Sequence, residues 1–461
     1  MLELKDYQRV AVERIVQRQR IIVGDERGLG KTATVLTAIK RLLGDIGGQA
    51  LVFVPSVGLG VWQDEAMKWI NEHAIIYSGE DPLHIRKIIW EEFKDTKPFL
   101  LVATYPMAKE IYERQVGWQA LICDEYHRVG LMNHKSATHK MIRKFRTRIM
   151  IPITGTPVRK GPQDLFAPLN LIDSFAFGSY WQFIGKHCIR INDTFGYTIE
   201  DKPKNPREFN AMLKPMFIYR TKKAVLKELP PKTRAPIKLR MTPKQEQMYN
   251  QLWDTLVMKV DDNKTIVAPN QAVKILYARQ LLVTPQIFGS KEVGAAIPAL
   301  IQNIEDEFDV KRSVAVCTPF KAGIPFIKEA IEKKLTKKVY VIHGDIKTPA
   351  RDVARAFQNN KDHDKVILYT VTSGMAFDAY EASTGFFVGY EWSAIDNLQA
   401  EDRMHRIGQL DPVNIYYFLH TGTVDEHVMS KLDDKTMAAN WVLHTQEVLR
   451  RKEDSRAQNP K

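Results

Sequence analysis

Short, continuously apolar runs recur along the first third of the chain, with amphipathic segments between them. The runs are Ala50 to Pro55, Phe99 to Thr104, Ala120 to Cys123 and Ile149 to Thr154. Apolar residues at helical spacing intervene at Val61–Ile70 and Lys135–Phe145. Uninterrupted apolar strands that alternate with helices are typical of a parallel sheet covered on both faces. The pattern therefore predicts an α/β fold, with ligand groups at the carboxyl ends of its strands.

This alternation weakens over residues 161–240 and then returns in the second half of the chain. Helical patterns resume at Pro243–Val260 and Gln271–Leu282. The later strand candidates are Ser313–Thr318, Lys338–Ile342, Val366–Thr370, Gly385–Val388 and Val413–Phe418. A length of 461 residues suits two to three domains at about 150 residues each. We expect two tandem α/β lobes, residues 1–160 and 241–435, joined by a helical insertion and linker over 161–240. Residues 436–461 are expected to be a helix end and polar tail.

A glycine-bearing turn follows the first short apolar run, Ile21 to Val23, and leads into a helical pattern. Such a turn at a helix N-terminus forms a nest of backbone N–H groups that binds phosphate. Lys31 would neutralise the β and γ oxygens of a nucleotide, and the Thr32 hydroxyl can ligate Mg²⁺. Asp25 stands at the first glycine of the pattern G-x-x-x-x-G-K-[ST], which leaves an ordinary strand-to-helix turn as the alternative.

A helical stripe precedes this turn. It comprises Leu4, Tyr7, Gln8, Val10 and Ala11, and most of it is expected to be core. Gln8 is polar, so it either belongs to the core or contacts an adenine edge, and the sequence alone leaves both alternatives open.

Two polar motifs close strands of the first lobe. After the strand that ends at Cys123 come Asp124, Glu125, Tyr126 and His127. One carboxylate there can hold Mg²⁺ through water and its neighbour can orient the attacking water, although paired acids are also common helix N-caps. The second motif, Thr154–Pro157, is a simple turn by itself, but its spacing after the acidic motif suggests a coupling element.

The densest polar run of the second half is Gln399–Gln409. Arg403 and Arg406 are three residues apart, which places them on one face of a helix. Two guanidinium groups presented together suit γ-phosphate recognition and transition-state charge. The alternative is a solvated, charged helix.

The net charge and the cysteines indicate what kind of partner and which cellular compartment to expect. The net charge is +13, from 67 Lys and Arg against 54 Asp and Glu, which favours a polyanionic partner. Cys123, Cys188 and Cys317 are far apart and lack zinc-ligand spacing, so they are expected to be reduced core thiols. Because there is no signal-peptide pattern and no apolar run near 18 residues, we expect a soluble, cytoplasmic protein.

Together the motifs resemble those of the Swi/Snf-type branch of the superfamily-two helicases, DNA translocases with two RecA-like lobes. Asp25–Thr32 is similar to the family's phosphate loop Asp-Glu-x-Gly-Leu-Gly-Lys-Thr, and Asp124–His127 to its Asp-Glu-x-His box. Thr154–Pro157 is similar to its Thr-Gly-Thr-Pro motif. Gln399–Gln409 is similar to its Gln-Ala-x-Asp-Arg-x-His-Arg-Ile-Gly-Gln box. The resemblance covers about residues 4 to 430.

This resemblance implies an ATP- and Mg²⁺-dependent enzyme acting on DNA, and it assigns residue roles. Nucleotide binding would fall to Gln8, Arg27, Gly28, Leu29, Gly30, Lys31 and Thr32. Thr32 and Asp124 would hold the metal, Glu125 would activate water, and Arg403 and Arg406 would reach the nucleotide from the second lobe. Coupling would involve Thr154, Gly155, Thr156 and Gln399. The residues facing the DNA backbone would be Pro55, Thr104, Thr318, Lys321 and Thr372.

One segment departs from the family pattern. Thr370–Asp378 stands where the family has Ala-Gly-Gly-x-Gly-x-Asn, and it is closer to the annealing-helicase subgroup. The implied function is a DNA translocase, with an RNA helicase and a catalytically idle nucleic-acid clamp as alternatives. Without room for accessory modules, the chain is expected to be a bacterial or phage-like motor, monomeric and not membrane-bound, with replication or repair proteins as candidate partners.

Overall fold

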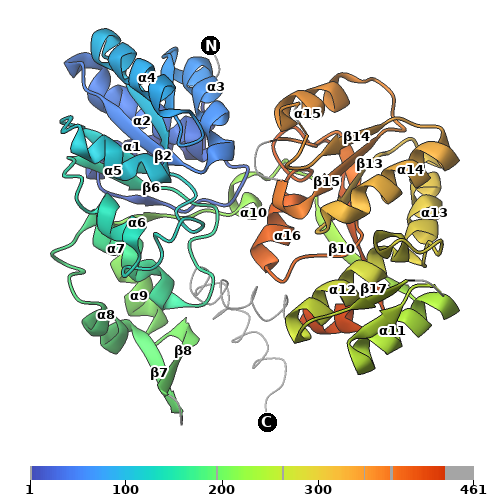
Figure 1. Ribbon diagram of the computed structural model, residues 1–461. Coiled ribbons are helices and arrows are strands. Elements are labelled where there is room, and N and C mark those ends of the chain that lie inside the picture. Colours follow the sequence, from blue (N-terminus) through green and yellow to red (C-terminus); the bar gives the residue numbers. More distant parts are fainter. Residues whose placement is uncertain (1–2, 194–195, 262–263, 347, 374–376, 431–461) are drawn as a thin grey trace. The chain divides into compact units, whose positions relative to one another are not determined.

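The computed structural model describes residues 3–193, 196–261, 264–346, 348–373 and 377–430. The chain divides into two compact units, which comprise the described residues of Met1–Lys227 and of Glu228–Asp434 (Figure 1). Each unit is described by itself below.

The first unit is built on a parallel sheet. Its five strands have the order β3 (Ala74–Tyr77), β4 (Leu100–Thr104), β2 (Ala50–Val54), β5 (Ala120–Cys123) and β6 (Ile149–Pro152). A short strand β1 (Ile22–Val23) continues this sheet, because Val23 forms a parallel bridge with Ile153 next to β6. On its other side β1 pairs in parallel with β9 (Phe217–Ile218).

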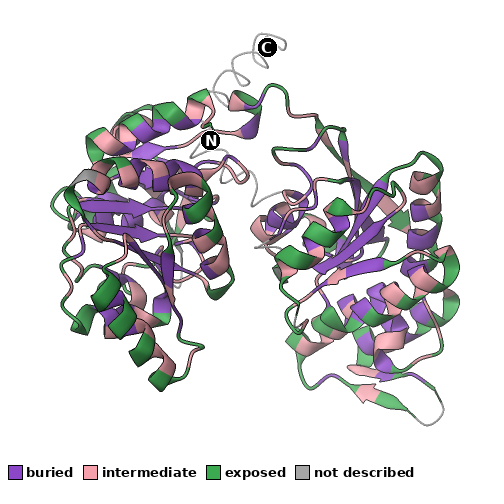
Figure 2. Cartoon of the chain, turned by 90° about the horizontal axis from the view of Figure 1, so that it is seen from above, coloured by how far each residue is buried: buried purple, intermediate pink, exposed green. Residues whose placement is uncertain are grey.

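Helices cover both faces of this sheet. They are α1 (Asp6–Arg18), α2 (Lys31–Leu43), α3 (Leu59–Ile70), α4 (Leu83–Thr96), α5 (Ala108–Glu113), α6 (Ala137–Ile142) and α7 (Phe166–Ile172). Along β2, Ala50, Val52 and Val54 enter one hydrophobic core, whereas Leu51 and Phe53 enter the other. Because successive side chains point to opposite faces, a strand buried on both faces must be apolar throughout (Figure 2).

The second unit repeats this architecture. Its six parallel strands have the order β10 (Lys232–Leu239), β17 (Val413–His420), β16 (Ala382–Phe387), β13 (Ser313–Thr318), β15 (Val366–Thr370) and β14 (Val339–Ile342). Its helices are α11 (Pro243–Thr255), α12 (Gln271–Val283), α13 (Ala296–Asp309), α14 (Ile324–Leu335), α15 (Ala350–Asn359) and α16 (Ala394–Glu401). The predicted α/β fold with two tandem parallel sheets is confirmed.

The region between residues 161 and 240 differs from the expected helical insertion and linker. It contains α8 (Tyr180–His187) and α9 (Pro206–Leu213), but also an antiparallel hairpin of β7 (Cys188–Asp193) and β8 (Gly196–Pro203). Residues 161–227 cluster with the first unit, and β10 already belongs to the second sheet. The hairpin and β10 are largely exposed, so neither carries the apolar run that revealed the buried strands. The expected tail, 436–461, lies outside the described residues.

Smaller expectations can be checked in the same way. The buried face of α1 is Gln8, Ala11, Val12 and Ile15, at the i, i+3, i+4, i+7 spacing of a helix that packs on a core. Val10 is 60% exposed, so its assignment to the core stripe was wrong.

All three cysteines are free and buried, as expected of core thiols. Among the described helices, we find none with the length and apolarity to cross a bilayer.

Candidate nucleotide-binding site

The predicted phosphate loop connects β1 to α2. Gly28 and Gly30 have φ angles of 79° and 72°, in the left-handed region that favours glycine. A Cβ atom on Gly30 would also lie 2.3 Å from Nε2 of Gln8. Position 30 therefore requires glycine for two reasons, its backbone conformation and the close approach of Gln8 on α1.

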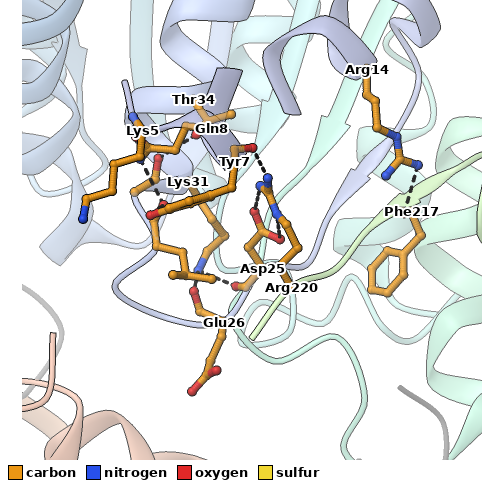
Figure 3. Close-up of polar contacts among 12 residues, drawn as sticks. Lys5, Tyr7, Gln8, Arg14, Asp25, Glu26, Lys31, Thr34, Phe217 and Arg220 are labelled. Atoms are coloured by element: carbon orange, nitrogen blue, oxygen red, sulfur yellow. Dashed lines mark hydrogen bonds and ion pairs between the residues drawn. The ribbon is translucent and has the colours of Figure 1, made fainter. Parts of the chain in front are cut away.

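Gln8 is buried, as the first of the two alternatives that the sequence left open requires. Its side chain is only 4% exposed, and its Nε2 donates to the Leu29 carbonyl at 3.1 Å. Its Oε1 accepts from the backbone N–H of Lys5 at 2.8 Å, and the Tyr7 hydroxyl donates to the same Leu29 carbonyl at 3.2 Å (Figure 3). In this arrangement the amide of Gln8 holds the phosphate loop against α1.

Lys31 is the first residue of α2, and its side chain folds back over the loop. Its Nζ donates to the carbonyl of Asp25 at 2.8 Å and lies 3.4 Å from that of Glu26 (Figure 3). Burial lowers the pKa of Lys31, while Glu125 and Asp25 act to raise it. The ammonium group therefore lies within electrostatic reach of the acidic motif as well as of the loop.

Asp25 has a partner that the sequence analysis missed. Its carboxylate is 1% exposed and accepts two hydrogen bonds from Arg220, from Nε at 3.0 Å and from Nη2. Arg220 also donates to the Tyr7 carbonyl, and its guanidinium carbon lies 5.1 Å from the centre of the Tyr7 ring (Figure 3). The residue that breaks the general phosphate-loop pattern is thus an anchor. Arg220 is 195 positions away in the sequence. The only local sign of such a partner was an aspartate at a position where the general pattern has glycine.

The chain around β9 makes further contacts with this loop. The N–H of Gly24 donates to the Ile218 carbonyl at 2.8 Å, and Glu26 accepts from the N–H of Lys222 at 2.6 Å. A Cβ atom on Gly24 would lie 2.5 Å from the ring of Phe217. On α1, Arg14 donates to the Phe217 carbonyl at 3.3 Å (Figure 3). The phosphate loop is therefore clamped between α1 and the β9 segment.

The acidic motif lies at the carboxyl end of β5, as predicted. Asp124 accepts hydrogen bonds from the indole Nε1 of Trp62 at 2.7 Å and from the backbone N–H of Glu125 at 2.8 Å. Burial, together with the charge of Glu125, raises the pKa of Asp124 to about 6. Glu125 has a φ angle of 46°, a strained conformation for a residue with a side chain. Burial acts to raise the pKa of Glu125, but His127, Arg27 and Lys31 outweigh it, so that its pKa is lowered.

Two of the residues expected to take part in coupling, Thr154 and Thr156, join the acidic motif to the phosphate loop. Nδ1 of His127 lies 3.0 Å from Oε2 of Glu125 and 2.7 Å from Oγ1 of Thr154. Thr154 in turn accepts from the N–H of Thr156 at 3.0 Å. Arg27 of the phosphate loop donates to the hydroxyl of Thr156 at 2.5 Å. The structure thus brings three separate sequence motifs of the first unit into one polar network.

Close packing explains the glycine in this motif. A Cβ atom on Gly155 would lie 2.3 Å from Cγ of Arg27, so any larger residue would displace the arginine from Thr156. A simple turn, the alternative for this motif, would not require that contact.

In the second unit, the arginine box differs from the expectation. The helix α16 ends at Glu401, and Arg403 and Arg406 lie in the turns that follow, so their predicted place on one helical face was wrong. Beyond the helix end, the Arg403 carbonyl accepts from the N–H of Ala379 at 2.9 Å. The two arginines still lie near each other, since Arg403 donates to the Phe377 carbonyl at 2.8 Å and Arg406 forms an ion pair with Asp378.

A buried charge cluster that the sequence analysis did not identify supports this box. Glu401 is fully buried and accepts from Lys232 at 2.8 Å, from Arg234 at 2.6 and 2.7 Å, and from the Tyr417 hydroxyl at 2.7 Å. Burial acts to raise the pKa of Glu401, but Lys232 and Arg234 outweigh it and lower the pKa. Gln399, expected to take part in coupling, is itself 2% exposed. Glu401 therefore holds the end of α16 against β10 and β17.

Comparison with known proteins agrees with this arrangement. Residues 7–286, more than half of the chain, match the SNF2-related domain. The chain belongs to the SNF2-related family. Residues 295–408 match the helicase conserved C-terminal domain, so the two matches account for both units of this SNF2-related chain.

The relatives of this SNF2-related chain are longer proteins. It is 25% identical over 461 residues to the "CHD3-type chromatin-remodeling factor CHR7" of Arabidopsis thaliana, with 93% of this chain and 36% of that protein covered. It is also 25% identical over 429 residues to the "Uncharacterized ATP-dependent helicase MG018" of Mycoplasma genitalium, with coverages of 90% and 39%. The chain thus spans about 40% of the length of these relatives. A solved "SWI2/SNF2 ATPase core in complex with dsDNA" from Sulfolobus solfataricus is 21% identical, with 97% and 95% coverage and a TM-score of 0.45.

The strand-end residues of this SNF2-related chain fall into two groups. Thr104 and Thr318 are 5% and 0% exposed, and their hydroxyls accept from the N–H groups of Gly79 at 3.1 Å and Phe320 at 3.4 Å. Lys321 and Thr372 are exposed and Pro55 is half-buried. Pro55 and Thr104 also line a cavity of about 330 Å³ at this edge of the first sheet. In the divergent Thr370–Asp378 segment, residues 374–376 lie outside the described part of the chain.

Proposed function

We propose that this SNF2-related chain is a DNA-dependent ATPase that uses ATP hydrolysis to translocate along DNA. The observation that carries the proposal is the polar network that joins the phosphate loop, the acidic motif and the Thr154–Thr156 turn. An idle clamp would have no use for a carboxylate that lies 3.0 Å from a buried histidine and within electrostatic reach of the phosphate-loop lysine, because binding alone needs no general base.

Each part of the network has a role in this proposal. The N–H groups of residues 28–32 and the Lys31 ammonium would bind the β- and γ-phosphates of ATP. The Thr32 hydroxyl and the Asp124 carboxylate are the hard oxygen donors that Mg²⁺ prefers. Bound Mg²⁺ would supply neutralisation of phosphate charge during transfer. Gln8 would contact the adenine edge in addition to holding the loop.

Glu125 would orient the attacking water and accept its proton. Its lowered pKa keeps the carboxylate ionised at neutral pH, and His127 fixes the carboxylate's direction. Because His127 also lies against Thr154, a shift of Glu125 on hydrolysis would move His127 and, through it, the Thr154–Thr156 turn. This turn would thereby couple the chemistry to the DNA-binding surface.

We propose that Arg403 and Arg406 complete the site by contributing charge to the transferred phosphate. Arg406 is paired with Asp378 in this structure, so it would exchange one anion for another when it engages the nucleotide. The DNA backbone would be followed by Pro55, Thr104, Thr318, Lys321 and Thr372. With the hydroxyls of Thr104 and Thr318 buried, these two would contact DNA through their backbone or support the loops that do.

Arg406→Ala is expected to lower the turnover number by about 10³-fold or more while ATP binding is retained, because an arginine finger acts on transition-state charge. Single-turnover hydrolysis and equilibrium binding of a fluorescent ATP analogue would measure the two effects. Arg355→Ala is the control, since Arg355 is an exposed arginine of the same unit. A wild-type rate for Arg406→Ala would contradict the proposed role of this arginine.

The function is tested by steady-state ATP hydrolysis at low salt, without polymer and with single-stranded DNA, duplex DNA, forked DNA or RNA. We expect strong stimulation by DNA and none in Glu125→Gln, which lacks the base but keeps the shape of the side chain. Stimulation by RNA instead of DNA would support an RNA helicase. No turnover with any polymer, despite measurable ATP and DNA binding, would support the idle clamp.

A further inference from the structure

The β7–β8 hairpin of the first unit and the preceding helix α8 together carry an exposed group of aromatic and cationic side chains. Trp181 on α8 is 54% exposed, Tyr197 on β8 is 37% exposed, and Arg190 on β7 is also exposed. In Figure 1 the hairpin projects from the unit beyond α8 and α9. Large rings are usually buried or half-buried, so their exposure together on a projecting element calls for a function.

The three side chains lie against one another. The guanidinium carbon of Arg190 is 4.6 Å from the centre of the Tyr197 ring and 5.9 Å from that of Trp181. The two rings are 5.7 Å apart with an interplanar angle of 66°. Among the described residues, no carboxylate forms an ion pair with Arg190. The group therefore combines exposed ring surface with a positive charge that forms no ion pair within the described part of the chain.

This aromatic group is attached to the loops of the candidate nucleotide site. Tyr180, the neighbour of Trp181, stacks on His134 at 4.4 Å, in the loop that follows the acidic motif. A Cβ atom on Gly161 would lie 2.9 Å from the carbonyl oxygen of Glu200 on β8. Gly161 follows the coupling turn, and Arg159 between them lies within 3.3 Å of the His127 carbonyl. One route of packing thus connects α8, and another the hairpin, to the segments around the acidic motif.

We propose that Trp181, Arg190 and Tyr197 form a binding site for unpaired nucleobases of DNA, next to a duplex that the motor engages. Exposed rings bind single strands by stacking, which is tolerant of sequence because every base has a π face. A guanidinium between the rings can pair with the adjacent phosphate and also strengthen stacking. This inference rests on the proposed function, since it adds a junction site to a DNA translocase.

The test compares the double variant Trp181→Ala/Tyr197→Ala with the wild-type chain. Dissociation constants are measured by fluorescence anisotropy for an oligothymidine, an abasic oligonucleotide of the same length, a blunt duplex and a fork. The wild-type chain should prefer oligothymidine to the abasic strand by about tenfold or more, as stacking on one or two bases predicts. The double variant should lose this preference and bind the fork no better than the blunt duplex.

Two further variants sharpen the result. Tyr112→Ala is the matched control, because Tyr112 is 41% exposed on the same unit and has Lys144 Nζ at 5.8 Å from its ring; it should behave as wild type. Trp181→Phe keeps a ring and should keep most of the preference. Blunt-duplex binding and duplex-stimulated ATP hydrolysis should stay within twofold of wild type in every variant.

Each other outcome overturns the inference. An unchanged preference in the double variant would show that these rings do not contact bases and would favour a protein partner for the patch. An equal loss of affinity for all four DNA molecules would show a general phosphate-binding surface. Failure of the proposed function is distinguishable, because the wild-type chain would then show no DNA-stimulated hydrolysis whatever the binding preference.

Discussion

Replacing Lys31 with alanine is expected to reduce ATP hydrolysis by at least about 10²-fold and to leave the fold intact. The ammonium group is the cation of the phosphate loop, and removing one preorganised electrostatic group from an active site typically costs about 10²–10³ in rate. Its hydrogen bonds in this structure are to the backbone carbonyls of Asp25 and Glu26. Removing the ammonium group therefore leaves no buried carboxylate without its only cation. A coupled assay gives the rate, and far-ultraviolet circular dichroism checks the fold.

Lys40→Ala is the matched control for Lys31→Ala. Lys40 lies on the same helix, forms an ion pair with Glu72 at 2.5 Å and has a side chain that is 39% exposed. It should hydrolyse ATP at close to the wild-type rate. Retained turnover in Lys31→Ala, with Lys40→Ala unaffected, would show that the nucleotide binds elsewhere.

Arg220→Ala is expected to be the most destabilising single substitution near the site, by about 3–5 kcal/mol, because it leaves a buried carboxylate without its cation. Asp25 has a side-chain exposure of 1% and Arg220 of 17%. The loop between β1 and α2 would lose its anchor to the β9 segment, so ATP affinity should fall together with stability. Urea denaturation monitored by tryptophan fluorescence, with and without ATP, measures both effects.

A surface pair provides the comparison for Arg220. Arg41 and Glu13 form an ion pair whose side chains are 54% and 53% exposed, and Arg41→Ala should cost less than about 1 kcal/mol. Adding Asp25→Ala to Arg220→Ala should recover part of the lost stability, because the uncompensated charge is then removed. Equal denaturation midpoints for Arg220→Ala and Arg41→Ala would show that the buried pair contributes no more than a surface pair.

The parts of the fold that the sequence predicted are those with a strong local pattern. Strand β2 is buried on both faces, and its apolar run identified it directly. The phosphate loop, the acidic motif and the Thr154–Thr156 turn were placed at strand ends by the same reasoning, and they do lie there. Gly30 was predicted from its motif, and the structure adds the physical reason, the approach of Gln8.

The parts that were missed depend on partners far away in the sequence or on exposed strands. Nothing local to Asp25 identifies Arg220, and nothing in the arginine box indicates that Glu401 is buried against Lys232 and Arg234. The helix that was expected to carry Arg403 and Arg406 ends at Glu401, and no local pattern indicated the contacts of these arginines with Phe377 and Asp378. The β7–β8 hairpin was missed because apolar and polar residues alternate over only about four positions in each strand, at 189–192 and 197–200, so neither strand carries the continuous apolar run that revealed the buried strands.

In both units, contacts between residues far apart in the sequence leave some groups without partners while the chain is being synthesised. Arg220 follows Asp25 of the phosphate loop by 195 residues, which at about 5–20 residues per second is roughly 10–40 seconds of translation. In the second unit, Thr233 on β10 contacts Asn414 on β17, 181 residues further on. Until these partner segments emerge, Asp25, which is buried in the folded protein, remains exposed on the nascent chain. The strand β10 likewise remains unpaired. Slower translation of the segment between the phosphate loop and Arg220 would lengthen the time for which Asp25 lacks its partner.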